Sequence, residues 1–216
     1  EPSNRVWTLN YAEEAQFHMD LLPCVPDDAR RLLASIAGDQ ALLQSSVGIT
    51  DQEHPNYRVR SRDWPVSNPK GYAVWFESRM AVARHRRASV LAERASVSVT
   101  QIPDYKVKTP LQAAVQILKR HRDVRFKDTK EVKPRSIIIT TLAAHAYKQE
   151  PTITEALISI LRRMDQFIQL DGGGHRIPNP TNEDENFADE WRTNNALKDA
   201  FFDWLDTARL DFSAAA

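Results

Sequence analysis

The sequence is poor in the features that mark several common kinds of protein. It holds one cysteine, Cys24, among 216 residues, so an internal disulfide framework is excluded. Its 29 basic and 29 acidic side chains cancel, which argues against bulk binding of nucleic acid. Its apolar runs are far shorter than the roughly 20 residues of a membrane helix. With 42% hydrophobic residues, the composition predicts a globular, cytoplasmic protein without a membrane partner.

Common catalytic motifs are absent as well. One cysteine and six scattered histidines form no zinc pattern, and no nucleophile elbow, phosphate loop or dinucleotide fingerprint occurs. The tripeptide His121-Arg122-Asp123 suggests a protein-kinase catalytic loop, but that motif needs an asparagine where this chain has Asp128. No Asp-Phe-Gly follows, so the kinase hypothesis fails. Spacing alone supports only a soluble α+β protein.

The order of predicted elements is strands first and helices afterwards. Alternating polarity predicts strands over residues 6–11 and 16–21, and residues 38–66 are predicted as loop with a short strand over 57–60. From residue 67 onward the pattern is helical. The predicted helices cover residues 72–95, 110–126, 134–147, 152–170 and 186–210, and the three glycines at 172–174 are predicted as a loop.

Two of these elements carry polar side chains that could take part in chemistry. His18 and Asp20 share the polar face of the second strand, where a carboxylate is held rigidly enough to serve as a metal ligand. The alternative is an ordinary solvated outer face. On the helix over 110–126, a lysine in a polar stripe could reach a phosphate or could simply be solvated. That stripe consists of Gln112, Gln116, Lys119 and Asp123.

Several segments, taken in order, resemble one family. The run from Phe17 to Pro23 looks like the strand that carries the third catalytic aspartate of the oligoadenylate synthase and cyclic GMP-AMP synthase group. It is most similar to the bacterial cGAS/DncV-like nucleotidyltransferases, or CD-NTases, of anti-phage signalling systems. The further matching segments are Ser67 to Tyr72 with Trp75-Phe76, Leu111 to Asp123, Lys133 to Ala143, and Asn179 to Asn182 with Glu185 to Ala188 and Trp191.

The resemblance implies a fold and an activity. The fold is α+β, with part of a nucleotidyltransferase palm sheet in residues 1–66 and a C-terminal helical bundle in residues 67–216. The activity is the joining of nucleoside triphosphates into cyclic or short linear oligonucleotide second messengers. Such enzymes use three carboxylates to hold two Mg²⁺ ions about 4 Å apart.

The resemblance also assigns roles to three residues. Asp20 is expected to be the third carboxylate, a catalytic residue that binds the metal beside the attacking hydroxyl. Lys119 and Ser136 match positions that hold triphosphate oxygens, and a helix N-terminus at Ser136 suits an anion. Related enzymes place a base-stacking aromatic residue soon after this serine, where the present chain has Ile137 and Ile138. Base stacking is therefore expected elsewhere.

One part of the family signature is missing from the sequence. No glycine is followed by serine, and no Asp-x-Asp pair occurs. One carboxylate cannot hold two metals, so we expect the N-terminal catalytic half to lie on the same or another chain and this portion to be inactive alone. Alternatives are a non-catalytic nucleotide- or protein-binding scaffold and a polymerase acting on RNA ends. The resemblance further suggests peptide-sensing or ubiquitin-conjugation-like proteins as regulators.

Overall fold

The computed structural model describes residues 5–12, 17–26 and 45–214. The contacts divide the chain into two compact units, which are described separately: Glu1–Trp75 with Pro180–Glu183, and Phe76–Asn179 with Asp184–Ala216. Strands and helices occur together, so the predicted α+β class is confirmed. The assignment of a palm to residues 1–66 and a helical lobe to 67–216 stays a prediction. No helix in the described ranges is long and apolar enough to span a membrane.

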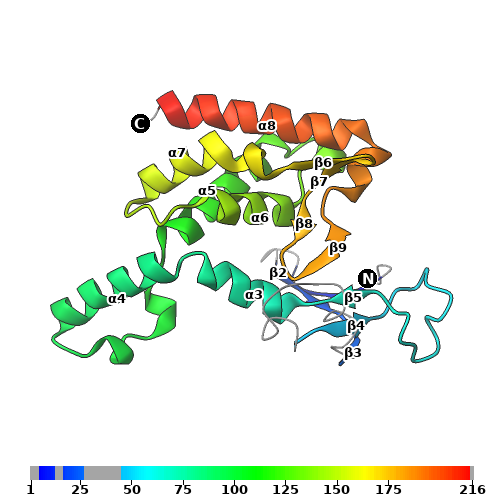
Figure 1. Cartoon of the computed structure of the whole chain (residues 1–216), viewed down its shortest axis with the longest axis horizontal. Coiled ribbons are helices and arrows are strands. Elements are labelled where there is room, and N and C mark those ends of the chain that lie inside the picture. Colours follow the sequence, from blue (N-terminus) through cyan, green and yellow to red (C-terminus); the bar gives the residue numbers. More distant parts are fainter. Residues whose placement is uncertain (1–4, 13–16, 27–44, 215–216) are drawn as a thin grey trace. The chain divides into compact units, whose positions relative to one another are not determined.

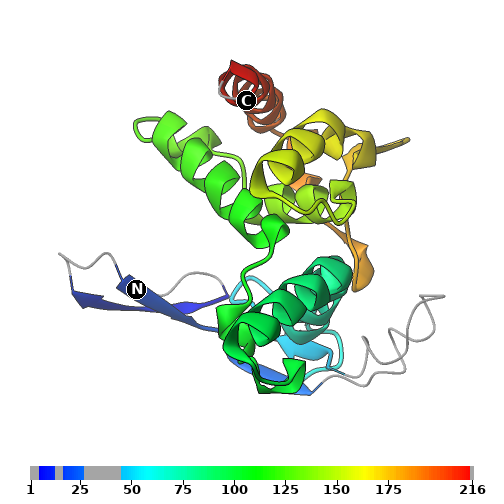
Figure 2. The ribbon, with the colours of Figure 1, turned by 90° about the vertical axis from the view of Figure 1, so that its left-hand side faces the viewer.

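In the first unit, the two predicted strands form an antiparallel pair (Figure 2). β1 (Trp7–Ala12) pairs with β2 (Phe17–Leu21), and Gln16 lies outside the described residues. The register places Thr8 opposite Asp20, with Leu9 opposite Met19 and Trp7 opposite Leu21. Because side chains alternate along a strand, Asp20 lies on the face opposite to that of the apolar side chains. The predicted alternation of polar and apolar side chains is thus present in the β1–β2 pair.

A second, three-stranded antiparallel sheet follows. It consists of β3 (Cys24–Pro26), β4 (Val47–Ile49) and β5 (Val66–Ser67) in that order. The prediction of a strand over 57–60 was wrong, because that segment forms turns in which the amides of Tyr57 and Val59 donate to nearby carbonyls. The β4 and β5 strands were missed because they are too short to show an alternating pattern.

The junction between strand and helix follows the predicted stop-and-start signal. α3 (Pro69–Ser78) begins after Asn68, which is 2% exposed. The side-chain oxygen of Asn68 accepts a hydrogen bond of 2.9 Å from the amide of Gly71. This contact satisfies one of the free amides of the first turn, and Pro69 at the first position needs no partner.

The second unit is mostly helical (Figure 1). Its helices are α4 (Ala81–Ala95), α5 (Pro110–Arg125), α6 (Ser136–Ala146), α7 (Ile153–Arg163) and α8 (Asn195–Ala214). α5 packs against α6, α7 and α8, and α7 packs against α6 and α8. The fully buried side chains at the centre of this bundle include Leu111, Leu118, Ile139, Leu142, Ile160, Phe201 and Trp204.

Short elements connect these helices. The 3₁₀ helices are η1 (Val99–Gln101), η2 (Asp104–Lys106), η3 (Lys130–Val132), η4 (Met164–Phe167) and η5 (Asp189–Arg192). The short strands are β6 (Gln169–Asp171), β7 (Gly174–Arg176), β8 (Pro178–Asn179) and β9 (Asn182–Asn186). β6 and β7 form a hairpin in which Gly172 and Gly173 make the turn, and Gly174, at φ 113°, begins β7.

Three predicted helices have different ends in the structure. The helix over 72–95 is two helices, α3 and α4, and the intervening Met80 is buried and accepts a hydrogen bond from Thr109 through its sulfur. The helix over 152–170 ends at Arg163, and the helix over 186–210 begins at Asn195. The start of α8 has a local cap, since the side-chain oxygen of Asn194 accepts from the amide of Ala196 at 3.1 Å.

Candidate functional site

Asp20 lies near the C-terminal end of β2 with an exposed side chain. Its cross-strand partner Thr8 donates a hydrogen bond of 2.7 Å from its hydroxyl to Oδ1 of Asp20. This bond holds the carboxylate in one orientation, and its other oxygen, Oδ2, makes no hydrogen bond within the described residues. A fixed, solvent-accessible carboxylate has the geometry of a metal ligand.

The opposite face of the same strand pair is apolar and uncovered in the part of the chain that the structure describes. Trp7 is 52% exposed, Leu9 43%, Met19 41% and Leu21 46%. The register brings these four side chains together on one face of β1 and β2. Four large apolar side chains gathered in this way are the usual mark of a surface that another segment covers.

Arg122 of α5 organises a polar cluster in the second unit. It is 5% exposed, and its Nη1 donates to the carbonyl of Pro134 at 3.0 Å and to the hydroxyl oxygen of Ser136 at 2.7 Å. Its Nη2 donates to Oδ1 of Asp123 at 2.6 Å. One guanidinium therefore joins the end of α5 to the start of α6.

Asp123 is the anion of this cluster. Burial alone would raise the pKa of its carboxyl, but hydrogen bonding and the charges of Arg122 and Lys133 outweigh burial, so the pKa is lowered. The Nζ of Lys133 lies 3.5 Å from Oδ1 of Asp123. The carboxylate is thus ionised at neutral pH and partly neutralises two cations.

Ser136 is the first residue of α6, as the resemblance required. Its hydroxyl oxygen accepts from Arg122, which leaves the hydroxyl proton available to a further acceptor. Arg135, the residue that precedes the helix, makes no capping hydrogen bond with its side chain. The first turn of α6 therefore combines an available hydroxyl with amides that suit an anion.

Lys119 is half-buried on α5 and makes no ion pair or hydrogen bond among the described residues. It precedes Arg122 by three residues and Asp123 by four, so its side chain shares their face of the helix. The residues of the predicted polar stripe have different partners. Gln112 closes the capping box with Thr109, while Asp123 pairs with Arg122 and Lys133.

Two of the three predicted site residues therefore belong to the same compact unit. Ser136 belongs to the Arg122 cluster of the second unit, Lys119 lies on the same face of α5 as Arg122 without a bond to the cluster, and Asp20 lies in the first unit. Sequence reasoning assigned no role to Arg122, although it lies in the matching segment Leu111 to Asp123, because its contacts with Pro134 and Ser136 are formed by residues twelve and fourteen positions away.

The described residues fit a Mg²⁺ site only in part. Asp20 supplies one oriented carboxylate, the hard oxygen ligand that Mg²⁺ prefers. No group of three or more histidine, cysteine, aspartate or glutamate side chains that could hold a metal occurs in the described ranges. A two-metal centre at Asp20 needs carboxylates beyond those that are described.

Comparison with known proteins gives two informative matches. The chain is 32% identical over 195 residues to a c-di-GMP synthase from Roseivirga ehrenbergii. The aligned region covers 88% of this chain and 45% of that protein. Its fold resembles the CD-NTase CdnG from Bradyrhizobium diazoefficiens, solved in complex with GTP, with a TM-score of 0.65 at 20% identity. This match covers 100% of the present chain and 62% of the other. No protein-family model matches the chain.

The chain spans about half the length of the curated relative that it matches. The sequence match covers most of the present chain, and the fold match extends over all of it. Both lead to the same group of enzymes, which is also the group suggested by the sequence motifs. By sequence and by fold, the chain is a relative of the bacterial CD-NTases, the cGAS-like nucleotidyltransferases.

Proposed function

We propose that the chain is part of a CD-NTase that joins nucleoside triphosphates into a cyclic oligonucleotide. The observation that carries this proposal is the sequence match to a c-di-GMP synthase over 88% of the chain. That relative's name and the GTP in the CdnG structure favour GTP as substrate and a cyclic dinucleotide of guanosine as product. We further propose that the product serves bacterial anti-phage signalling in the cytoplasm.

In this proposal Asp20 is one carboxylate of the metal centre. Bound Mg²⁺ would neutralise the triphosphate and lower the pKa of the attacking ribose hydroxyl. The hydrogen bond from Thr8 holds Asp20 in one orientation, which suits the strict geometry of in-line displacement at phosphorus. Asp20 also offers an oxygen to which the hydroxyl proton can pass.

Lys119 and Ser136 are proposed to hold the triphosphate. Lys119 brings a cation without a competing carboxylate in the described residues, and Ser136 brings a hydroxyl proton at a helix N-terminus. Arg122 positions Ser136 and adds positive charge behind it. These groups act on charge and orientation, which are the main protein contributions to phosphoryl transfer.

The remaining carboxylates are proposed to come from a further segment, on the same chain or another, that carries the Gly-Ser and Asp-x-Asp motifs. The exposed apolar face of Trp7, Leu9, Met19 and Leu21 supports this idea, because it offers a ready packing surface. Peptide-sensing or ubiquitin-conjugation-like regulators belong to the same proposal. Without the further segment, we expect no turnover.

The test is product formation by the full-length protein. Mixing it with Mg²⁺ and the four nucleoside triphosphates should give cyclic dinucleotide, detected by liquid chromatography and mass spectrometry. Asp20→Asn should abolish product, whereas Asp184→Asn, which changes an exposed strand carboxylate on β9, should not. Unchanged product with Asp20→Asn would refute the role of Asp20. Nucleotide binding without any product would favour the scaffold hypothesis.

A further inference from the structure

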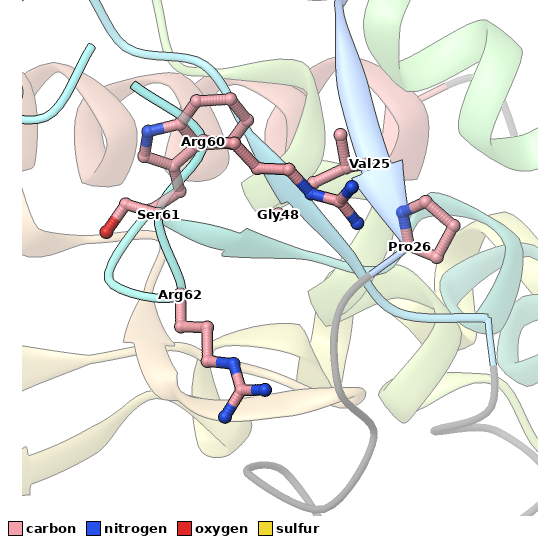
Figure 3. A pocket seen from close by; sticks show the side chains of 7 residues that line it. Val25, Pro26, Gly48, Arg60, Ser61 and Arg62 are labelled. Atoms are coloured by element: carbon pink, nitrogen blue, oxygen red, sulfur yellow. The ribbon is translucent and has the colours of Figure 1, made fainter. Parts of the chain in front are cut away.

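A cavity of about 430 Å³ opens in the first unit, beside the three-stranded sheet (Figure 3). Its floor is formed by Val25 of β3, Gly48 of β4 and the indole of Trp64. Its rim is formed by the loop residues Arg60, Ser61 and Arg62. The volume lies within the range of small-molecule sites, about 300–1,000 Å³.

The rim is cationic, and its two arginines have no anionic partner in the described part of the chain. Arg60 and Arg62 are exposed, and neither forms an ion pair or hydrogen bond with another described residue. The adjacent carboxylate, Asp63, instead accepts from the hydroxyl of Ser61 at 3.4 Å. Figure 3 shows the guanidinium of Arg60 extending over Gly48 towards Pro26, whereas the side chain of Arg62 points away from Arg60. One guanidinium over the cavity and a second at its rim, neither paired among the described residues, favour an anion with several oxygens.

The loop that carries these arginines is braced by its own contacts. The indole nitrogen of Trp64 donates to the carbonyl of Asn56 at 2.9 Å. The side-chain amide of Asn56 donates to the hydroxyl of Ser61 at 3.3 Å, and the amide of Asp63 donates to the same hydroxyl at 3.1 Å. A braced loop loses less conformational entropy when a ligand binds, which favours affinity.

Gly48 keeps the floor open. A Cβ at this position would lie 3.7 Å from the Cβ of Trp64 and 3.7 Å from Cγ2 of Val25, both ordinary contact distances. Alanine therefore fits there, whereas a longer side chain would occupy the space above the floor. Since Gly48 is buried in the middle of β4, substitution acts on the cavity without changing its charge.

We propose that this cavity binds a phosphate-bearing ligand of nucleotide size. The phosphate oxygens would bind the guanidinium of Arg60, with Arg62 adding positive charge at the same rim, and the organic part would lie over Gly48 and Trp64. Binding here requires neither a metal ion nor Asp20, so it does not depend on the function proposed above. Free inorganic pyrophosphate shares the phosphate chemistry but would leave the floor of the cavity empty.

Calorimetric titration in EDTA tests this binding separately from catalysis. GTP should bind at least as tightly as pyrophosphate, and guanosine should show no binding. The double variant Arg60→Gln/Arg62→Gln should weaken GTP binding at least tenfold. The matched control is Arg58→Gln, which removes an exposed arginine of the same loop outside the cavity and should change affinity less than twofold. Gly48→Leu should weaken GTP more than pyrophosphate.

Several outcomes would overturn the proposal. Equal loss of affinity in Arg58→Gln and in the double variant would indicate a general effect of charge. Binding of pyrophosphate without GTP would exclude a nucleotide-sized ligand. Binding that needs Mg²⁺ and disappears in Asp20→Asn would place the nucleotide at the carboxylate site. If Gly48→Leu fails to fold, the exposed arginine variants decide the question alone.

Discussion

The guanidinium of Arg122 donates a hydrogen bond of 2.7 Å to the hydroxyl oxygen of Ser136. This contact spans fourteen residues of sequence and connects the end of α5 to the start of α6. Because Arg122 is buried and also bonds Pro134 and Asp123, it fixes Ser136 in place while leaving the serine proton available. Arg122 therefore ties α5 to α6 and positions the serine that we propose to bind the triphosphate.

The first prediction concerns stability. Arg122→Ala should lower the free energy of unfolding by about 2–4 kcal/mol, since it removes charge-assisted hydrogen bonds and leaves the Pro134 carbonyl buried without a donor. Urea unfolding measured by circular dichroism checks this. Arg120→Ala, an exposed position on the same helix, should stay within about 0.5 kcal/mol of the parent. Similar losses in both variants would contradict the bracing role of Arg122.

The second prediction concerns substrate binding in the full-length protein. Lys119→Gln and Ser136→Ala should each raise the KM for GTP about tenfold, because each removes one hydrogen bond or charge from the triphosphate. The fold should be kept in both variants, and product identity should not change. Steady-state kinetics with Lys127→Gln, an exposed lysine just beyond α5, provides the control. An unchanged KM in both site variants would place the triphosphate elsewhere.

The third prediction follows from Tyr147, which is 2% exposed. Burial, with a smaller contribution from the charge of Glu150, raises the pKa of its phenol to about 12 from 10.0. The stabilising effect is fully present below pH 10 and is lost as the pH rises towards 12, because the unfolded chain ionises first. Unfolding measured between pH 9 and 12 should show this loss.

Two variants separate that effect from general alkaline unfolding. Tyr147→Phe should remove the Tyr147 contribution to the pH dependence, although it also loses the hydrogen bond of 3.0 Å to the carbonyl of Glu150. Tyr105→Phe, at a tyrosine that is 78% exposed, should leave the pH dependence as it is. The same alkaline slope in Tyr147→Phe as in the parent would show that another group is responsible.

The fourth prediction concerns the start of α5. Thr109→Ala should cost about 1–2 kcal/mol in unfolding free energy, since the threonine side chain accepts from the amide of Gln112 and contacts the sulfur of Met80. Thr109→Ser keeps the cap and should recover most of the loss. Thermal unfolding of the two variants side by side makes the comparison. Failure of serine to recover stability would assign the effect to the threonine methyl group.

Local sequence predicted a large part of the fold. The strands around β1 and β2 follow from their alternating polarity, and the start of α5 follows from Thr109-Pro110. The break between α3 and α4 could not be found in this way, because Met80 is held by a contact with Thr109, twenty-nine residues away.

In the candidate site, too, some features follow from the local sequence and others from long-range contacts. The sequence by itself determined which residue types were available and, through its motifs, the family to which they pointed. It also determined the face of β2 on which Asp20 lies, because strand alternation is a local property. The tertiary structure alone decided that Thr8 orients Asp20, that Arg122 joins Asp123 to Ser136, and that Arg60 and Arg62 border a cavity over Gly48. Such contacts depend on how distant segments pack, which no local pattern encodes.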